Sequence, residues 1–302
     1  MNSVAPDQAG PPISEPNAPP ISRGQRLLRW IKGHKIKTFL LVILAFILFE
    51  LATIPFFGVA SLKTENPEQT ALMRQRLSEA EHEGKKLKIT QRWVPFSRIS
   101  RHLVNAVIVA EDGTFYTHNG FDWYEVQESI EKNIDKRRAV RGASTITQQL
   151  AKNLYLSTSK DPIRKLKEAI ITLLLENSLS KNRILEIYLN VIEWGRGVFG
   201  VEAAAQTYFG KSAASLTLEE ATRMAAVIPS PLRHRPDEDS RYVLRRQQIV
   251  LRRMSARNFA GSPTTEETQS KADLEQLLIP DDTSEVNMSL DSTDVEEESN
   301  GL

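Results

Sequence analysis

The feature that most constrains this chain is an apolar stretch of 25 residues, Thr38–Leu62, that contains a single charged residue, Glu50. A helix needs about 20 apolar residues to cross a hydrocarbon layer of about 30 Å, so this stretch is long enough to span a membrane. A cleaved signal peptide is the alternative, but its apolar region is shorter and ends at small residues, unlike Pro55 and the two phenylalanines after it. The stretch therefore predicts a single transmembrane helix over residues 38–62.

The residues before this stretch predict which way the chain crosses the membrane. Residues 23–37 contain six Lys and Arg and no acidic residue. Because such cationic flanks stay on the cytoplasmic side, this end is expected in the cytoplasm and everything after Leu62 outside it. Residues 1–22 are rich in Pro, Ala, Ser and Asn, which predicts a disordered cytoplasmic leader.

Charge is distributed unevenly along the chain. Residues 261–302 contain twelve acidic residues and one base, Lys271, which predicts a solvated, disordered tail. The whole chain has a net charge of +1, so the preceding part is strongly basic. A basic body indicates an anionic partner: a membrane surface, nucleic acid or a phosphorylated substrate. The absence of cysteine excludes disulfides, cysteine-ligated zinc and thiol nucleophiles.

Helix signals dominate after a membrane-proximal segment, residues 63–91. Four capping patterns predict helix starts, and a short strand is predicted within residues 86–94. The region from 92 to 260 is therefore expected to be one mainly α-helical domain. The residues that carry the capping patterns are Asp122 with Glu125, Asp161 before Pro162, Ser180, and Thr217 with Glu220.

An acidic pair, Glu111 and Asp112, follows the apolar run Leu103–Ala110. A carboxylate at the end of a buried helix is held by the core while it faces a loop. Partial desolvation there raises its pKa towards that of a useful general base. Taken alone, the pair fits a solvated helix end better than a catalytic site, and His118 fits a residue that packs or pins the loop.

The segment Gly142–Leu154 is more informative. A helix beginning near Ser144 would bury one apolar side and present hydroxyls, amides and a lysine on the other. Such a face suits sugar hydroxyls and a phosphate, and a helix N-terminus also favours an anion. A solvated polar face is the alternative, although paired glutamines are unusual there. The two sides are Ile146, Leu150 and Leu154, and Thr145, Gln148, Gln149 and Lys152.

A third stretch places Arg164 and Lys165 four and three residues before Glu168, so all three share one helix face. They could form a surface ion-pair cluster worth a few tenths of a kcal/mol, roughly. Taken alone, the stretch fits this cluster better than the alternative, a diphosphate clamp with a carboxylate that holds a metal or acts on the leaving group. A fourth stretch, residues 184–209, contains glycines that permit a tight loop and close backbone approach.

Taken together, these four stretches resemble, in order and spacing, the peptidoglycan glycosyltransferases of family fifty-one. The resemblance runs from about residue 92 to residue 236, and its most specific part is the segment 142–153. It implies a mainly α, lysozyme-like fold behind the membrane helix, in a bacterial inner membrane. Only 66 residues follow Pro236, which favours the form without a transpeptidase domain. Arg196 stands where the family often has an uncharged or acidic residue.

The resemblance also implies the chemistry. The 4-hydroxyl of the acceptor sugar attacks a lipid-linked donor, lipid II or the growing glycan, a β-1,4 bond forms, and undecaprenyl diphosphate leaves. Glu111 corresponds to the base, and Glu168 assists the diphosphate. No organic cofactor is implied, although Glu168 could hold a divalent cation such as Mg²⁺ or Mn²⁺. The substrate-binding residues would be Asp112, Ser144, Gln148, Gln149, Lys152, Asn153, Arg164 and Lys165.

The expected partners are lipid II, the nascent glycan, membrane lipids and proteins of cell division or cell-wall synthesis, with no nucleic acid. Two other functions fit parts of the sequence. A muramidase-type hydrolase on the same fold would also use acidic residues, but it has no need of Lys152, Arg164 and Lys165. A membrane scaffold without catalytic activity would have no need of Glu111 and Glu168.

Overall fold

The computed structural model describes residues 23–24, 30, 32–135, 144–159 and 161–257, with side chains left undescribed at 130–135. The predicted leader, residues 1–22, and the predicted acidic tail, residues 261–302, lie outside the described residues. The chain divides into two units, which meet between Ser61 and Leu62.

The first unit contains the predicted membrane helix. Its helices are α2 (Lys35–Ala52) and α3 (Phe56–Ser61), and the stretch Lys35–Ser61 is long and apolar enough to cross a membrane. The single span predicted over 38–62 is confirmed as a candidate, and its helix is interrupted between Ala52 and Phe56. The helix stops before Pro55, because proline has no backbone N–H and disfavours helical geometry in the residue before it.

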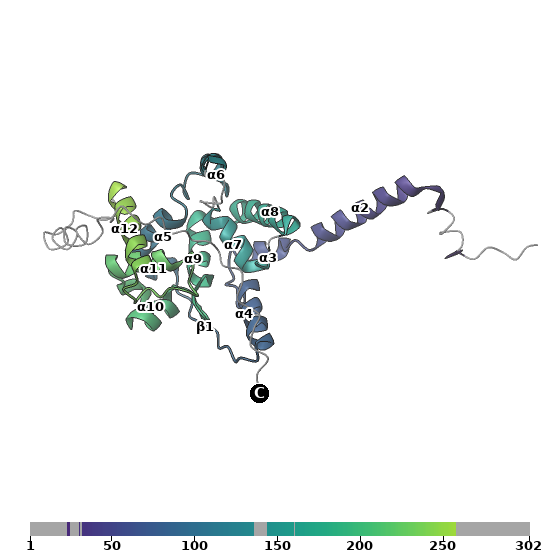
Figure 1. Ribbon diagram of the computed structural model, residues 1–302. Helices are drawn as coiled ribbons and strands as arrows, with labels where there is room; N and C mark the ends of the chain where they lie inside the picture. Colours follow the sequence, from purple (N-terminus) through teal and green to yellow (C-terminus); the bar gives the residue numbers. More distant parts are fainter. Residues whose placement is uncertain (1–22, 25–29, 31, 136–143, 160, 258–302) are drawn as a thin grey trace, which may run out of the picture. The chain divides into compact units, whose positions relative to one another are not determined.

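The second unit is mainly helical, as predicted (Figure 1). Two groups of helices pack within it: α5, α11 and α12 form one, and α7 packs on α4, α8 and α9 in the other. The helices are α4 (Ala71–His82), α5 (Arg101–Glu111), α6 (Trp123–Asp135), α7 (Ile146–Tyr155), α8 (Pro162–Ser178), α9 (Lys181–Val191), α10 (Val201–Phe209), α11 (Leu218–Val227) and α12 (Arg241–Ala256), with short 3-10 turns η1 (Phe96–Arg98) and η2 (Ala213–Ser215).

The predicted capping residues begin the helices for which they were proposed. Asp161 accepts hydrogen bonds from the first backbone amides of α8, which then starts with Pro162. Ser180 caps α9, and Thr217 forms a reciprocal capping box with Glu220 at α11. These local signals place the helix starts correctly because each is satisfied within one turn of chain.

A small sheet with strand order β1-β3-β2 lies beside the helices. The strand predicted within residues 86–94 is β1 (Thr90–Gln91), which pairs in parallel with β3 (Val198–Phe199). Strand β2 (Glu193–Gly195) pairs antiparallel with β3 across the glycine loop. Gly200 has φ +78°, and a Cβ there would lie 2.6 Å from the Asn190 carbonyl oxygen, so the predicted close backbone approach is confirmed.

Helix α9 packs against α7 and is buried along most of its length. Five of its side chains between residues 184 and 189 are fully buried: Ile184, Leu185, Ile187, Tyr188 and Leu189. Its last turn also carries a buried amide, Asn190, which accepts from the Val94 backbone N–H and donates to the Val94 carbonyl, both at 2.9 Å. A buried asparagine with both ends satisfied in this way fixes the segment before α5 to the core.

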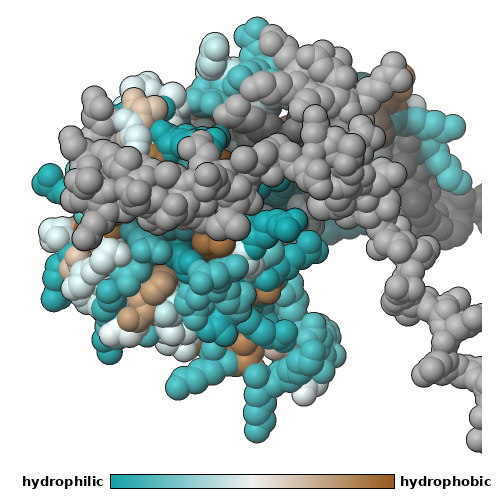
Figure 2. Space-filling model, turned by 60° about the vertical axis from the view of Figure 1, so that its left-hand side comes forward, coloured by the Kyte–Doolittle hydropathy of each residue, from teal (hydrophilic) through white to brown (hydrophobic). Residues whose placement is uncertain are grey.

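The surface seen in Figure 2 is mostly hydrophilic, with smaller apolar areas between.

We expect Asn190→Ala to lower the free energy of unfolding by about 2–3 kcal/mol, since both backbone groups of Val94 lose a buried partner. Thermal unfolding of the full chain in detergent measures the loss. Asn177→Ala is the matched control, because that asparagine is exposed on α8. Equal melting temperatures for the two variants would contradict this role for Asn190.

Candidate active site

Glu111 is the last residue of α5, a helix whose inner side is buried from Leu103 to Val109. Its carboxylate accepts a hydrogen bond from Gln149 Nε2 on α7 at 2.8 Å. The other end of that amide is also held, because the Tyr188 hydroxyl donates to Gln149 Oε1 at 2.9 Å. The buried Tyr188 therefore orients the glutamine that contacts Glu111.

Burial raises the pKa of Glu111, and this effect outweighs the hydrogen bond from Gln149 and the positive charge of Arg246, which both lower it. This direction and cause match the desolvated base that the sequence offered, and the solvated helix end that the acidic pair alone favoured is wrong. A carboxyl group whose pKa is raised in this way is suited to accept a proton from a sugar hydroxyl near neutral pH.

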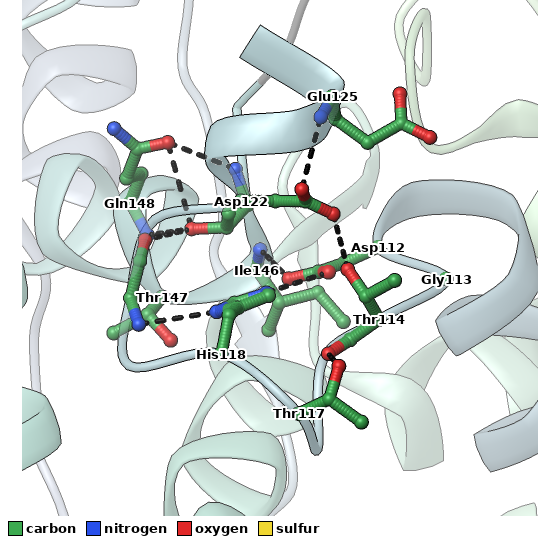
Figure 3. A network of polar contacts seen from close by, with 12 residues as sticks. Asp112, Gly113, Thr114, Thr117, His118, Asp122, Glu125, Ile146, Thr147 and Gln148 are labelled. Atoms are coloured by element: carbon green, nitrogen blue, oxygen red, sulfur yellow. Dashed lines mark hydrogen bonds and ion pairs between the residues drawn. The ribbon is translucent and has the colours of Figure 1, made fainter.

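Asp112 joins the end of α5 to the start of α7, as Figure 3 shows. One carboxylate oxygen accepts from the Ile146 backbone N–H and the other from His118 Nε2, each at 2.9 Å. The Gly120 N–H donates to His118 Nδ1, so this ring nitrogen carries no proton and Nε2 is the donor. Asp112, predicted as a substrate-binding residue, thus has both oxygens engaged with the protein, and His118 pins the loop as the sequence suggested.

The start of α7 differs in detail from the prediction. Thr145 is the N-cap, and it forms a reciprocal capping box with Gln148. The Gln148 side-chain oxygen accepts from the Thr145 N–H at 3.0 Å, and the Thr145 hydroxyl donates to the Gly120 carbonyl at 2.7 Å. The polar face predicted for substrate is therefore partly used to begin the helix. Its apolar face is buried as predicted, at Ile146, Leu150 and Leu154.

A cavity of about 650 Å³ opens beside Glu111. Four of the predicted site residues line it. Further lining comes from α12 and the residue after it, which contribute three arginines that were not predicted from the sequence. The predicted residues are Glu111, Asp112, Ser144 and Gln149, and the added arginines are Arg246, Arg253 and Arg257.

All three arginines donate to backbone carbonyls, and the partner of Arg257 is the Gly113 carbonyl. Arg246 Nε donates to the Ala226 carbonyl, and Arg253 Nη1 donates to the Val109 carbonyl, both at 3.0 Å. The spacing of seven residues between Arg246 and Arg253 matches that between the buried Val243 and Val250, which marks an inward face of α12. That periodicity was the available signal, but α12 follows the stretches on which the sequence analysis concentrated.

Arg164, Lys165 and Glu168 form the cluster that their spacing predicted. Arg164 Nη1 lies 2.6 Å from Glu168 Oε2, and Lys165 contacts the other carboxylate oxygen. Glu168 is only 3% exposed, so this is not the surface ion-pair cluster of the simpler interpretation. Its single negative charge faces two cations, which leaves the cluster with net positive charge.

Lys152 on α7 interacts electrostatically with both carboxylates, Glu111 and Glu168. Burial lowers the pKa of Lys152, and the nearby cations Arg164 and Lys165 lower it further. The charges of Glu168 and Glu111 both act in the opposite direction. The structure thus links the cavity residues to the α8 cluster through α7, although Lys152, Asn153 and the three α8 residues do not line the cavity itself. Asn153 is buried on the same helix.

The described residues do not fit a cation held by the protein at Glu168. Among them, no group of three or more His, Cys, Asp or Glu side chains converges. Both Glu168 oxygens already contact cationic side chains, whereas Mg²⁺ and Mn²⁺ need several oxygen ligands. The possible metal role predicted for Glu168 therefore has no support in the donor set of these residues.

Comparison with known proteins identifies the family to which the chain is similar. The model of the family described as Transglycosylase matches residues 79–255. Proteins named biosynthetic peptidoglycan transglycosylase are similar to the chain. That of Nitrosospira multiformis is 49% identical over 63% of this chain and 83% of its own length, and that of Dechloromonas aromatica is 50% identical over the same shares. That of a Janthinobacterium species is 43% identical over 74% of this chain and 96% of its own length.

We expect Glu111→Gln to raise the melting temperature at neutral pH by about 2–4 °C, because the amide avoids the cost of burying a charge. The folded chain binds the Glu111 proton more tightly than the unfolded chain does. The wild type therefore loses stability relative to the variant as pH rises from the ordinary glutamate pKa through the raised one. Thermal unfolding at acidic and neutral pH tests this, and a difference that does not grow with pH would contradict it.

Proposed function

This chain belongs to the transglycosylase family of peptidoglycan synthesis, and we propose that its cavity joins lipid II units into a β-1,4-linked glycan. The observation that carries the proposal is the half-buried Glu111, held by Gln149 in a cavity beside a net-positive cluster on α8. A hydrolase of finished glycan would not need those cations, whereas a diphosphate leaving group does.

Glu111 acts as the general base in this proposal. Because its pKa is raised, the Glu111 carboxylate can take the proton from the acceptor's 4-hydroxyl as that oxygen attacks the donor's anomeric carbon. Gln149 and Tyr188 orient the carboxylate, because the glutamine amide is hydrogen-bonded at both ends. Asp112 positions this assembly through the α7 N-terminus and does not itself contact the substrate in this mechanism.

The cationic cluster takes the leaving diphosphate. Arg164 and Lys165 provide fixed positive charge, and Glu168 holds both cations in place. Lys152 extends this charge towards Glu111, so negative charge that develops on the leaving oxygen is met by cations already in position. These side chains supply the neutralisation in the mechanism, and no step is assigned to a metal.

The membrane anchor supports a lipid-linked substrate. We propose that the candidate span crosses the inner membrane of a bacterium with the basic residues before it in the cytoplasm, so that the second unit lies outside. Enzyme and substrates then meet in two dimensions. We also propose that the chain works without a transpeptidase, since it covers 83% to 96% of the length of relatives named for transglycosylation alone.

Purified wild-type chain is expected to polymerise lipid II in detergent, and Glu111→Gln to reduce the rate by about 10²–10⁴-fold through loss of the base. Labelled lipid II and gel separation of the product measure the rate, with muramidase digestion to identify the β-1,4 glycan. Glu81→Gln is the matched control, because Glu81 is an exposed glutamate on α4 that does not line the cavity. Full polymerisation by Glu111→Gln would exclude Glu111 as the base.

Arg246→Gln is expected to move the acid limb of kcat/KM to higher pH, by up to about one pH unit. The reason is that the positive charge of Arg246 lowers the pKa of Glu111, and the active form of the base is deprotonated. Arg246→Lys keeps the charge and should leave the acid limb close to that of the wild type. A profile unchanged in Arg246→Gln would show that this arginine does not act on Glu111.

A further inference from the structure

Helix α4 is hydrogen-bonded to the loop that precedes α8. Gln75 Nε2 donates to the Thr158 hydroxyl at 2.6 Å, and the Thr158 backbone N–H donates to Gln75 Oε1 at 3.1 Å. The two bonds use both ends of one amide, so they fix the distance and the orientation of the loop relative to α4. We refer to this pair as the Gln75–Thr158 clasp. Thr158 belongs to the stretch 157–159, which has no role in the functional site described above.

The α4 side of the clasp is itself braced. Gln75 Nε2 also donates to Glu79 at 2.6 Å, and Glu79 pairs with Arg76 at 2.8 Å. Arg76 in turn contacts Glu193 on β2 at 2.8 Å, where that carboxylate is buried. This chain of polar contacts ties α4 to the sheet, so Gln75 projects from a fixed support.

The loop side of the clasp leads directly to the cationic cluster. Ser159, next to Thr158, accepts a hydrogen bond from Arg164 Nε at 2.5 Å through its carbonyl oxygen. Arg164 Nη1 reaches Glu168 at 2.6 Å. The Arg164 guanidinium is thus held at two points. One of them is the Ser159 carbonyl, whose position depends on the Gln75–Thr158 clasp.

We propose that Gln75 is a positioning residue for diphosphate binding, which acts through Thr158 and Ser159 to aim the Arg164 guanidinium. The proposal rests on the function proposed above, because it assigns the diphosphate to the α8 cluster. Gln75 precedes residues 79–255, which the family model matches, so this half of the clasp is a feature of the membrane-proximal segment. The segment after the membrane span therefore contributes to substrate binding without contacting the substrate.

The physical basis is preorganisation. A surface arginine loses side-chain entropy when it binds an anion, and this cost falls if the protein already holds the guanidinium in place. Without the clasp, Ser159 and the loop sample more positions, so Arg164 must be ordered by the ligand. The expected consequence is weaker binding with little change in the chemical step.

The test measures two quantities on the full chain: the Kd for inorganic diphosphate by calorimetry, and KM and kcat for lipid II. Gln75→Ala removes both clasp bonds and should raise Kd and KM about three- to tenfold, with kcat within about twofold. Thr158→Val removes only the hydroxyl and should give a smaller rise. Thr158→Ser keeps the hydroxyl and should restore wild-type values. Gln69→Ala, an exposed glutamine just before α4, is the matched control.

A double-mutant cycle separates positioning from general damage. In an Arg164→Ala background, Gln75→Ala should have no further effect on the diphosphate Kd, because its target is gone. A Kd for Gln75→Ala equal to that of Gln69→Ala, or an effect that persists without Arg164, would overturn the proposal. If the wild type fails to polymerise lipid II while Gln75→Ala still weakens diphosphate binding through Arg164, the proposed function fails and the clasp stands.

Discussion

The Asp112 carboxylate is the interaction on which the rest of the site depends. It accepts hydrogen bonds from the Ile146 amide at the start of α7 and from the His118 ring in the loop between α5 and α6. Asp112 adjoins Glu111, and Ile146 lies three residues before Gln149. This one carboxylate therefore positions the Gln149 amide relative to the Glu111 carboxylate. Segments 34 residues apart in the chain are brought together by a charge-assisted hydrogen bond at a helix N-terminus.

The same site opposes the stability of the fold. Burial raises the pKa of Glu111 and lowers the pKa of Lys152, so both groups are pushed towards their neutral forms. The charges of Arg246 and Arg253 offset part of the cost of desolvating Glu111, and the charges of Glu168 and Glu111 do the same for Lys152. Neighbouring groups with opposite pKa shifts, here on α5 and α7, are typical of a site in which a proton and a negative charge must move during the reaction.

Sequence reasoning succeeded where the signal was local. The helix starts at Asp161, Ser180 and Thr217 follow from side chains that satisfy backbone amides within one turn. The grouping of Arg164 with Glu168 follows from helical spacing alone. It was less accurate for Gln148, whose amide completes a capping box, because the sequence does not show whether a polar side chain serves the helix or a ligand.

The sequence alone determined that this chain has a membrane-spanning stretch, a mainly helical domain and acidic and basic residues in the order of a peptidoglycan glycosyltransferase. Apolar length, helical period and capping chemistry are properties of neighbouring residues, so they can be recognised without a fold. Only the tertiary structure decided that Arg246 and Arg253 face Glu111, and that Gln75 holds the loop before Arg164. Those partners are separated by more than eighty residues, and such contacts arise only when the packing of whole helices selects which faces meet.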